Sequence, residues 1–470
     1  MSIHTVLLRA LSLPGNDQCS YPPPGIQEED EDEDDREVTQ PTDCNSPAET
    51  PPQPSNTTVS PRYLTEALRV DKGQDAKLVS WTTKDFTSKG DNFVSVITSV
   101  IVQYHAQGSE DLQDETYVVK IKQATENGSV SDFDNMVFNK EGKFLSELLP
   151  LLNAELAGIG HECLKVPRFL HAKWLENQNQ LFLNDLRALK FKLYDRKMGL
   201  DPPHTRLVLC ELGRLHAISH VLQSKRPKRT LNQDFNFLDW EWFTYSKKLK
   251  SSFEVLVSGG LITASLMAKE VGKNKAEQWF EAKSSTGVAM LAEQLVCDSP
   301  NFNVIGHGDC WINNLLFKYD DRGLPKEIYL LDLQFVRQSS LGTDLSYFFF
   351  TSLERTDRRE RLEEMLTTYY DSFKSIVDAA LIPMPFTPEE LLEEYQRRTL
   401  FGLIMSSLLL PNILCDPEEV QHFDAGVDGC AGSYIERKRL RSLKMLQNNG
   451  VFRKRMVDLF DDIEELTDLT

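Results

Sequence analysis

The sequence predicts an α+β fold with two lobes, in which a small strand-rich lobe precedes a larger and mostly helical one. Segments with apolar residues at alternate positions, as in half-buried strands, gather between residues 93 and 183. From Leu186 onward, apolar residues recur at the three- and four-residue spacing of helices with one buried face. The chain of 470 residues, 40% of them hydrophobic, is long enough to form both cores.

The first sixty residues have a different composition and are predicted to be a disordered tail. They hold twelve acidic residues and two arginines, and so carry −10 of the net charge of −19. The stretch from Pro22 to Pro61 is also rich in Pro, Ser and Thr and has too little apolar surface to offset the entropy lost on ordering. We therefore divide the chain into the tail 1–60, a first lobe 61–185 and a second lobe 186–470.

Composition also limits the partners and the compartment. Residues 61–470 carry the remaining net charge of −9, and nothing in them suggests a basic surface for nucleic acid. The eight cysteines show no C-x-x-C pair and no zinc spacing, so a reduced compartment is expected. An N-terminal signal is not predicted, because Arg9 and Pro14 interrupt the apolar residues there. The longest apolar run, Thr399 to Pro411, is shorter than the ~20 residues of a membrane span and is read as a core helix. We expect a cytoplasmic protein without a membrane span; its oligomeric state is left open.

The first lobe should begin with a helix and continue mainly as strands. Its predicted elements are a helix from Pro61, a strand pair from Phe93, a strand over 115–122, a helix over 136–152, and strands over 166–169 and 180–183. Gly90 and Asn92 lie in the turn of the strand pair, where backbone N–H groups can cover phosphates. Lys120 follows an apolar pair, as the phosphate-binding lysine of V-A-I-K does. Lys122 shares its strand face, so both lysines are candidates.

The second lobe contains a pattern typical of phosphoryl transfer. His307, Asp309 and Asn314 form H-x-D-x-x-x-x-N, and Asp332 lies in the apolar run 328–333, which reads as a buried strand. Transfer of a phosphoryl group to a hydroxyl needs a carboxylate that accepts the proton of that hydroxyl. It also needs oxygen ligands that hold magnesium against the phosphates. We assign Asp309 as the base, and Asn314 and Asp332 as the metal ligands. Positioning of the reactants alone can lower the activation barrier of such a reaction by on the order of 7 to 11 kcal/mol.

Further candidates lie around this pattern. Asp344 is in the first turn of a predicted helix, where its carboxylate can accept backbone N–H bonds from the catalytic loop. His216 lies among apolar residues of a predicted helix, which favours a satisfied core histidine over a base. Cys310 is interpreted as a small packed side chain. An aromatic group either lines an apolar acceptor site or belongs to the core: Trp240, Trp242 and Phe243.

The motif H-G-D-x-W-x-x-N, with Trp311 inside it, and D-x-Q at Asp332 to Gln334 resemble the choline-kinase-like (CHK) family of arthropods and nematodes that includes the ecdysteroid kinases. More distantly, the chain is similar to aminoglycoside phosphotransferases and choline kinases. The resemblance covers the chain from about Tyr63 to its end. It implies a bilobal protein-kinase-like fold.

The resemblance also implies roles in the first lobe. A K-G-D-N-like turn occupies the place of Gly90 and Asn92 in this family, which favours their role over the phosphates. The family pattern F-x-x-E-x-x-F implies that Glu141 is the partner of Lys120. The hinge is N-D-L from Asn184 to Leu186, where the family commonly has E-D-L. Backbone groups of Asn184 and Leu186 are expected to bind adenine, and the replacement of Glu leaves any side-chain role of Asn184 in doubt.

Together these residues predict an ATP- and Mg²⁺-dependent kinase that transfers the γ-phosphoryl group to a hydroxyl of a small metabolite, with an ecdysteroid implied by the resemblance. A choline or ethanolamine kinase is the first alternative, and a catalytically silent nucleotide-binding scaffold is the second. A third makes the acidic tail a docking segment. Protein substrates are disfavoured because no A-P-E segment follows Asp332.

Overall fold

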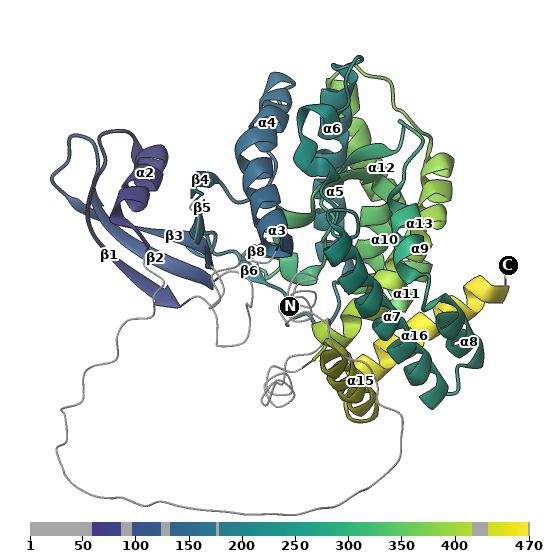
Figure 1. The fold of residues 1–470 in the computed structure, drawn as a ribbon. Coiled ribbons are helices and arrows are strands. Elements are labelled where there is room, and N and C mark those ends of the chain that lie inside the picture. The colour runs from purple at the N-terminus through teal and green to yellow at the C-terminus, as the bar shows by residue number, and fades with distance from the viewer. Residues whose placement is uncertain (1–58, 86–95, 124–131, 175–177, 416–430, 469–470) are drawn as a thin grey trace, which may run out of the picture.

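The computed structural model describes residues 59–85, 96–123, 132–174, 178–415 and 431–468. Within them, a five-stranded sheet and a large group of helices form the two lobes of the predicted α+β fold (Figure 1). The first part contains α2 (Pro61–Lys72), β1 (Lys77–Asp85), β2 (Val96–His105), β3 (Leu112–Gln123), α3 (Asp132–Lys143), a π-helical segment η1 (Phe144–Leu148), α4 (Leu149–Gly158), β4 (Phe169–Lys173) and β5 (Gln178–Asn184).

The sheet is antiparallel and has the strand order β1-β2-β3-β5-β4. Helix α2 packs on β1 and β4, and its buried Leu64 and Leu68 join a small core on that face. Because side chains alternate along a strand, Tyr117, Val119 and Ile121 of β3 enter this core, whereas Lys120 and Lys122 point to the opposite face. This alternation directs both candidate lysines away from α2.

The predictions for this part are mostly confirmed. Helix α2 begins at Pro61, and β2, β3 and β5 fall where alternation placed them. The prediction for 166–169 was wrong, since β4 begins only at Phe169. The helix predicted over 136–152 is interrupted by η1, and local π-segments of this kind are frequent near functional sites.

The second part is mostly helical and encloses a larger core. Its elements are β6 (Lys192–Leu193), α5 (Pro202–Ser224), α6 (Leu231–Asp234), η2 (Asn236–Asp239), α7 (Lys247–Glu270), α8 (Asn274–Lys283), α9 (Gly287–Leu295), β7 (Asn303–Gly306), η3 (Ile312–Asn314), β8 (Leu315–Tyr319), β9 (Pro325–Leu330), η4 (Leu333–Phe335), β10 (Arg337–Ser340), α10 (Leu341–Ser352), α11 (Arg355–Glu360), α12 (Leu362–Ala379), α13 (Pro388–Ile413), α15 (Ala431–Asn448) and α16 (Gly450–Asp468).

Two small sheets hold the loop that carries His307, Asp309 and Asn314, which we call the catalytic loop after its predicted role. Strand β7 pairs with β10, and β8 pairs with both β6 and β9. The loop between β7 and β8 therefore begins on one sheet and ends on the other. Its neighbours are α5 and α10, which both contact β7.

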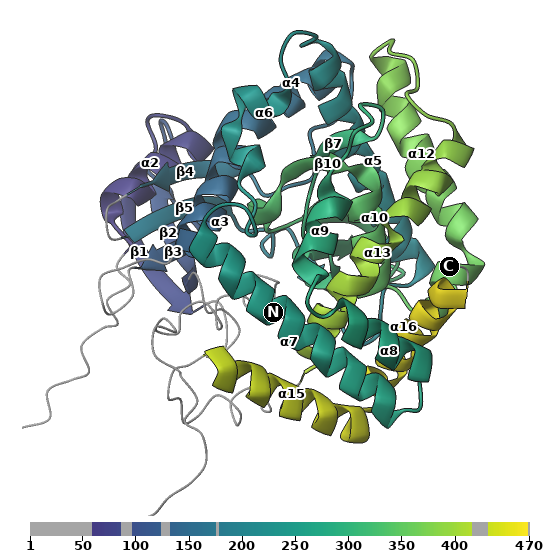
Figure 2. The same cartoon turned by 45° about the vertical axis from the view of Figure 1, so that its right-hand side comes forward.

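Two long apolar helices lie in this part. The run predicted to be a core helix is buried in α13, which continues past Pro411 to Ile413. Among the described residues, α7 is long and apolar enough to cross a membrane by length and composition, although 44% of its most apolar window is buried. It packs against α8, α9, α13 and α15 (Figure 2), as core helices of soluble proteins also do.

Candidate active site

The catalytic loop turns sharply at Gly308. This residue has φ of +79°, and a Cβ there would lie 2.0 Å from the backbone oxygen of Phe335. A larger residue is excluded both by the left-handed backbone and by this approach. Gly308 therefore lets the loop pack directly against the segment that follows Asp332.

Asp344 braces the loop, as predicted. Its carboxylate accepts backbone N–H bonds from His307 at 2.5 Å and from Gly308 at 2.9 Å, and Nε2 of His216 lies 3.2 Å away. Burial alone would raise the pKa of Asp344, but the bond and charge of His216, with the backbone N–H groups, hold it at about 2. Because Nδ1 of His216 is 2.7 Å from the Tyr369 hydroxyl, the interpretation of His216 as a satisfied core histidine is confirmed.

Asp309 is fully buried, and each of its carboxylate oxygens has a partner. Oδ1 accepts a 2.6 Å bond from the Tyr347 hydroxyl, and Oδ2 accepts a 3.0 Å bond from Nδ2 of Asn314. Burial raises the pKa of Asp309 well above its ordinary value, and these two hydrogen bonds oppose the rise. The structure thus joins Asp309 and Asn314 directly by a hydrogen bond. Their assignments as base and metal ligand stay predictions.

Tyr347 is the residue that sequence reasoning missed. It follows Asp344 by three positions on α10, so both side chains lie on one helix face toward the catalytic loop. That spacing was readable from the sequence and is the signal that would have found it. Tyr347 is 1% exposed, so its hydroxyl is reserved for Asp309 rather than solvent.

The second group of predicted residues forms an ion-paired triad, which we call the Lys120 triad: Lys120, Glu141 and Asp332. Nζ of Lys120 donates to Glu141 at 2.8 and 2.9 Å and to Oδ1 of Asp332 at 2.7 Å. Burial would lower the pKa of Lys120, but the two carboxylates raise it above its ordinary value, so the lysine stays charged. The triad joins β3, α3 and the turn after β9.

Lys122 is placed differently. It is 2% exposed and its Nζ lies 3.4 Å from Asp134 rather than near Glu141 or Asp332. Although the Asp134 carboxylate favours the charged form, burial prevails and lowers the pKa of Lys122 to about 6. Of the two lysines, the geometry brings Lys120 to the predicted site.

The prediction that a strand carries Asp332 was wrong. Strand β9 ends at Leu330, and Asp332 has a left-handed backbone with φ of 63° before η4 begins. Such strained conformations of non-glycine residues cluster at functional sites. Oδ2 of Asp332 accepts a 3.0 Å bond from Gln334. The N–H of Leu331 donates to the backbone oxygen of Asn314 at 2.8 Å, which joins the two halves of the site.

The hinge residues lie at the end of β5. The N–H of Asn184 donates to the backbone oxygen of Arg168, and its Oδ1 accepts from the N–H of Arg168 at 2.7 Å. The backbone oxygen of Leu186 accepts from the N–H groups of Leu189 and Phe191. An adenine contact would therefore fall to other backbone groups of this segment, and the assignment stays a prediction. Gly90 and Asn92 lie outside the described residues.

The aromatic candidates and Cys310 lie mainly in the core. Trp242 and Phe243 belong to the large core, and the ring centroids of Trp242 and Phe253 are 4.3 Å apart. Trp240 is only partly buried at the edge of this core. Cys310 is 0% exposed, which confirms its interpretation as a packed side chain.

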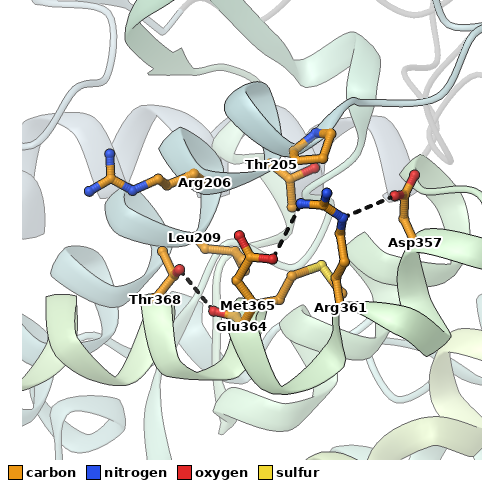
Figure 3. Close-up of a pocket in the computed structure, with 9 residues that line it drawn as sticks. Thr205, Arg206, Leu209, Asp357, Arg361, Glu364, Met365 and Thr368 are labelled. Carbon is orange, nitrogen blue, oxygen red and sulfur yellow. Dashed lines mark hydrogen bonds and ion pairs between the residues drawn. The ribbon is translucent and has the colours of Figure 1, made fainter.

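A surface pocket between α5 and α12 is distinct from this site (Figure 3). Its lining includes Arg361, which lies 3.7 Å from Asp357 and 3.3 Å from Glu364. A second arginine, Arg206, also lines the pocket. The Lys120 triad, Asp309 and Asn314 do not line it.

Comparison with known proteins identifies the family. No curated protein gives a significant match. The model of the ecdysteroid kinase-like (EcKL) family matches residues 89–380, which is more than half of the chain and includes the Lys120 triad and the catalytic loop. Membership implies a kinase-like small-molecule phosphotransferase that uses ATP. The chain therefore belongs to the ecdysteroid kinase-like family.

Proposed function

We propose that the protein transfers the γ-phosphoryl group of Mg-ATP to a hydroxyl of a small lipophilic metabolite such as an ecdysteroid. The observation that carries the proposal is that the Lys120 triad lies beside Asp309 and Asn314, where the N–H of Leu331, next to Asp332, donates to the backbone oxygen of Asn314. These residues come from separate elements, and the charge of Asp332 is close enough to raise the pKa of Asp309. Agreement between motif, topology and geometry supports one common purpose for them.

Each residue has a role that follows from its contacts. Lys120, fixed by Glu141, would pair with the nucleotide phosphates. Asp309 would accept the proton of the acceptor hydroxyl, and its raised pKa suits a group that must bind a proton during the reaction. Tyr347 and Asn314 hold its carboxylate in place. Little covalent chemistry is left to the protein, so positioning and charge do most of the work.

The chain offers ligands that fit magnesium. Asn314 uses its amide nitrogen for both bonds to Asp309, which orients the amide and leaves oxygen as the atom it would present to a metal. The Asp332 carboxylate is the second oxygen donor, and hard oxygen ligands are what magnesium requires. No cluster of three or more His, Cys, Asp or Glu suited to a metal occurs in the described residues. Phosphate oxygens and water would supply the remaining ligands.

The test uses the full chain with Mg-ATP and a panel of ecdysteroids, other hydroxylated metabolites and choline, followed by mass spectrometry. Asp309→Asn should lose most phosphorylated product and still bind ATP, whereas Asp332→Asn should lose metal-supported nucleotide binding. Asp321→Asn, in the exposed turn between β8 and β9, is the matched control. Equal turnover of Asp309→Asn and the parent would refute the assignment of the base.

A choline product would replace the ecdysteroid proposal with the choline-kinase alternative. ATP binding without any product across the panel would favour the scaffold. The reduced cytoplasmic location also stays a prediction.

A further inference from the structure

Two buried cations and a partly buried carboxylate form a second cluster outside the site described above, which we call the Glu241 cluster: Lys140 of α3, Glu241 after η2, and Arg337 of β10. Oε1 of Glu241 lies 3.4 Å from Nζ of Lys140 and 3.1 Å from Nε of Arg337. Nζ of Lys140 also donates a 2.9 Å hydrogen bond to the backbone oxygen of Trp240. The cluster thus ties α3 to a segment about 100 residues later in the chain.

Joining two segments through such a cluster carries a free-energy cost, because charged groups lose their hydration when they are buried. Lys140 is 1% exposed and Arg337 is 5% exposed, so both cations have given up most of their hydration. One carboxylate serves two cations, and burial lowers the pKa of Lys140 to about 8 although Glu241 opposes the fall. Apolar side chains would fill the same space at lower cost. The directional contacts of Lys140, to a carboxylate and to a backbone oxygen, are what apolar residues cannot supply.

The position of Lys140 gives these contacts a consequence for the Lys120 triad. Lys140 directly precedes Glu141, which holds Lys120. On the following residue, Gly142, an added Cβ would lie 2.3 Å from the ring of Trp174, so α3 is closely packed there as well. Helix α3 is therefore held on either side of Glu141, by the Trp240 backbone through Lys140 and by Trp174 at Gly142.

The other end of the cluster is near the base. Arg337 follows Asp332 by five residues and pairs across β10 and β7 with Gly306, three residues before Asp309. Its charge opposes the burial that raises the pKa of both Asp309 and Tyr347. Glu241 therefore contacts Arg337, which lies near Asp309. It also contacts Lys140, which is next to Glu141 in the chain. The segment that carries Trp240 and Glu241 borders both halves of the proposed site.

We propose that Lys140 is a positioning residue that fixes α3 on the segment of Trp240 and Glu241 and thereby holds Glu141 against Lys120 for nucleotide binding. The inference rests on the proposed function, since it takes Lys120 as the lysine that meets the phosphates. It adds a residue that acts only through Glu141 and does not touch the nucleotide.

The test measures Mg-ATP affinity of the full chain by titration calorimetry, together with the melting temperature. Lys140→Met keeps the neutral pair of Glu241 and Arg337 and removes only the link to α3, so the protein should still fold. We expect its Mg-ATP affinity to fall about tenfold, within the range of typical coupling between sites. Lys140→Arg, which keeps the charge and hydrogen-bond donors, should recover most of it. Lys143→Met is the matched control, because Lys143 is a half-exposed lysine of the same helix.

A second comparison separates positioning from a general loss of structure. If Lys140 acts through Lys120, then Lys140→Met should change Mg-ATP affinity no further in a Lys120→Met background. A folded Lys140→Met variant with parental affinity, or one whose effect adds fully to that of Lys120→Met, would overturn the inference alone. A parent chain that binds no Mg-ATP would refute the proposed function and this inference with it.

Discussion

Replacing Asp344 by Asn should destabilise the protein strongly, although the change removes no bulk. The pKa of Asp344 is about 2, compared with an ordinary value of 3.8, so its ionised form stabilises the fold by about 2 to 3 kcal/mol at neutral pH. An amide also has only one acceptor oxygen for the N–H groups of His307 and Gly308. Leaving one of them unpaired in the interior costs about 1 to 3 kcal/mol more. The expected total is about 3 to 6 kcal/mol.

Urea unfolding at pH 7 measures this loss. Asp320→Asn is the matched control, because Asp320 also accepts two backbone N–H bonds, from Arg322 and Leu324, but in an exposed turn. The control should lose at most about 1 kcal/mol. A second series follows pH. Since the folded-state pKa of Asp344 is depressed, its stabilisation is complete above about 3.8 and disappears as the pH falls through about 2. The difference between parent and variant should shrink over that interval.

Two results would refute this reasoning. The first is a loss in Asp344→Asn no larger than in the Asp320 control, which would mean that the bonds to the loop contribute little. The second is a difference that stays constant between pH 4 and pH 2. In that case the loss would come from altered packing and not from the ionised carboxylate.

Two further substitutions test the site and the fold around it. Tyr347→Phe removes the hydrogen bond from the hydroxyl to Asp309, and a bond to a charged group contributes about 1.5 to 3 kcal/mol. Product formation should fall at least about tenfold while Mg-ATP affinity stays unchanged. Unchanged turnover of the variant would contradict the role of Tyr347. Lys122→Met should raise stability at neutral pH, because folding forces this lysine to a pKa of about 6 from 10.5. The parent's unfolding free energy should rise by up to about 1.4 kcal/mol per pH unit between these values, and the variant should lack that slope; parallel pH profiles would contradict the argument.

Local patterns were sufficient for several elements of the first part and for the loop motif, but not for the strand over 166–169 or for Tyr347. Alternation located β2, β3 and β5, and the spacing of the catalytic loop identified Asp309 and Asn314, which the structure joins by a hydrogen bond. These signals are local, because strand alternation and loop motifs depend on residues a few positions apart.

Contacts between residues that are far apart in the chain could not be predicted from local sequence patterns. Lys120 and Lys122 share one strand face, and only the position of α3 separates their partners. Asp332 follows an apolar run that reads as a strand, yet the chain leaves the strand at Leu330 so that the carboxylate can meet Lys120. The Glu241 cluster joins residues about 100 positions apart and has no local pattern at all.

The two carboxylates of the proposed reaction differ in their access to solvent. The side chain of Asp332 is 23% exposed, whereas Asp309 is 0% exposed. If Asp309 is the base, an acceptor hydroxyl reaches it only after the packing around it opens. The acceptor need not displace Tyr347 or Asn314, because a carboxylate can accept about four hydrogen bonds and Asp309 uses two for these partners. Until the acceptor enters, the same packing keeps water from the base, and exclusion of water is what prevents an enzyme of this kind from wasting ATP by hydrolysis.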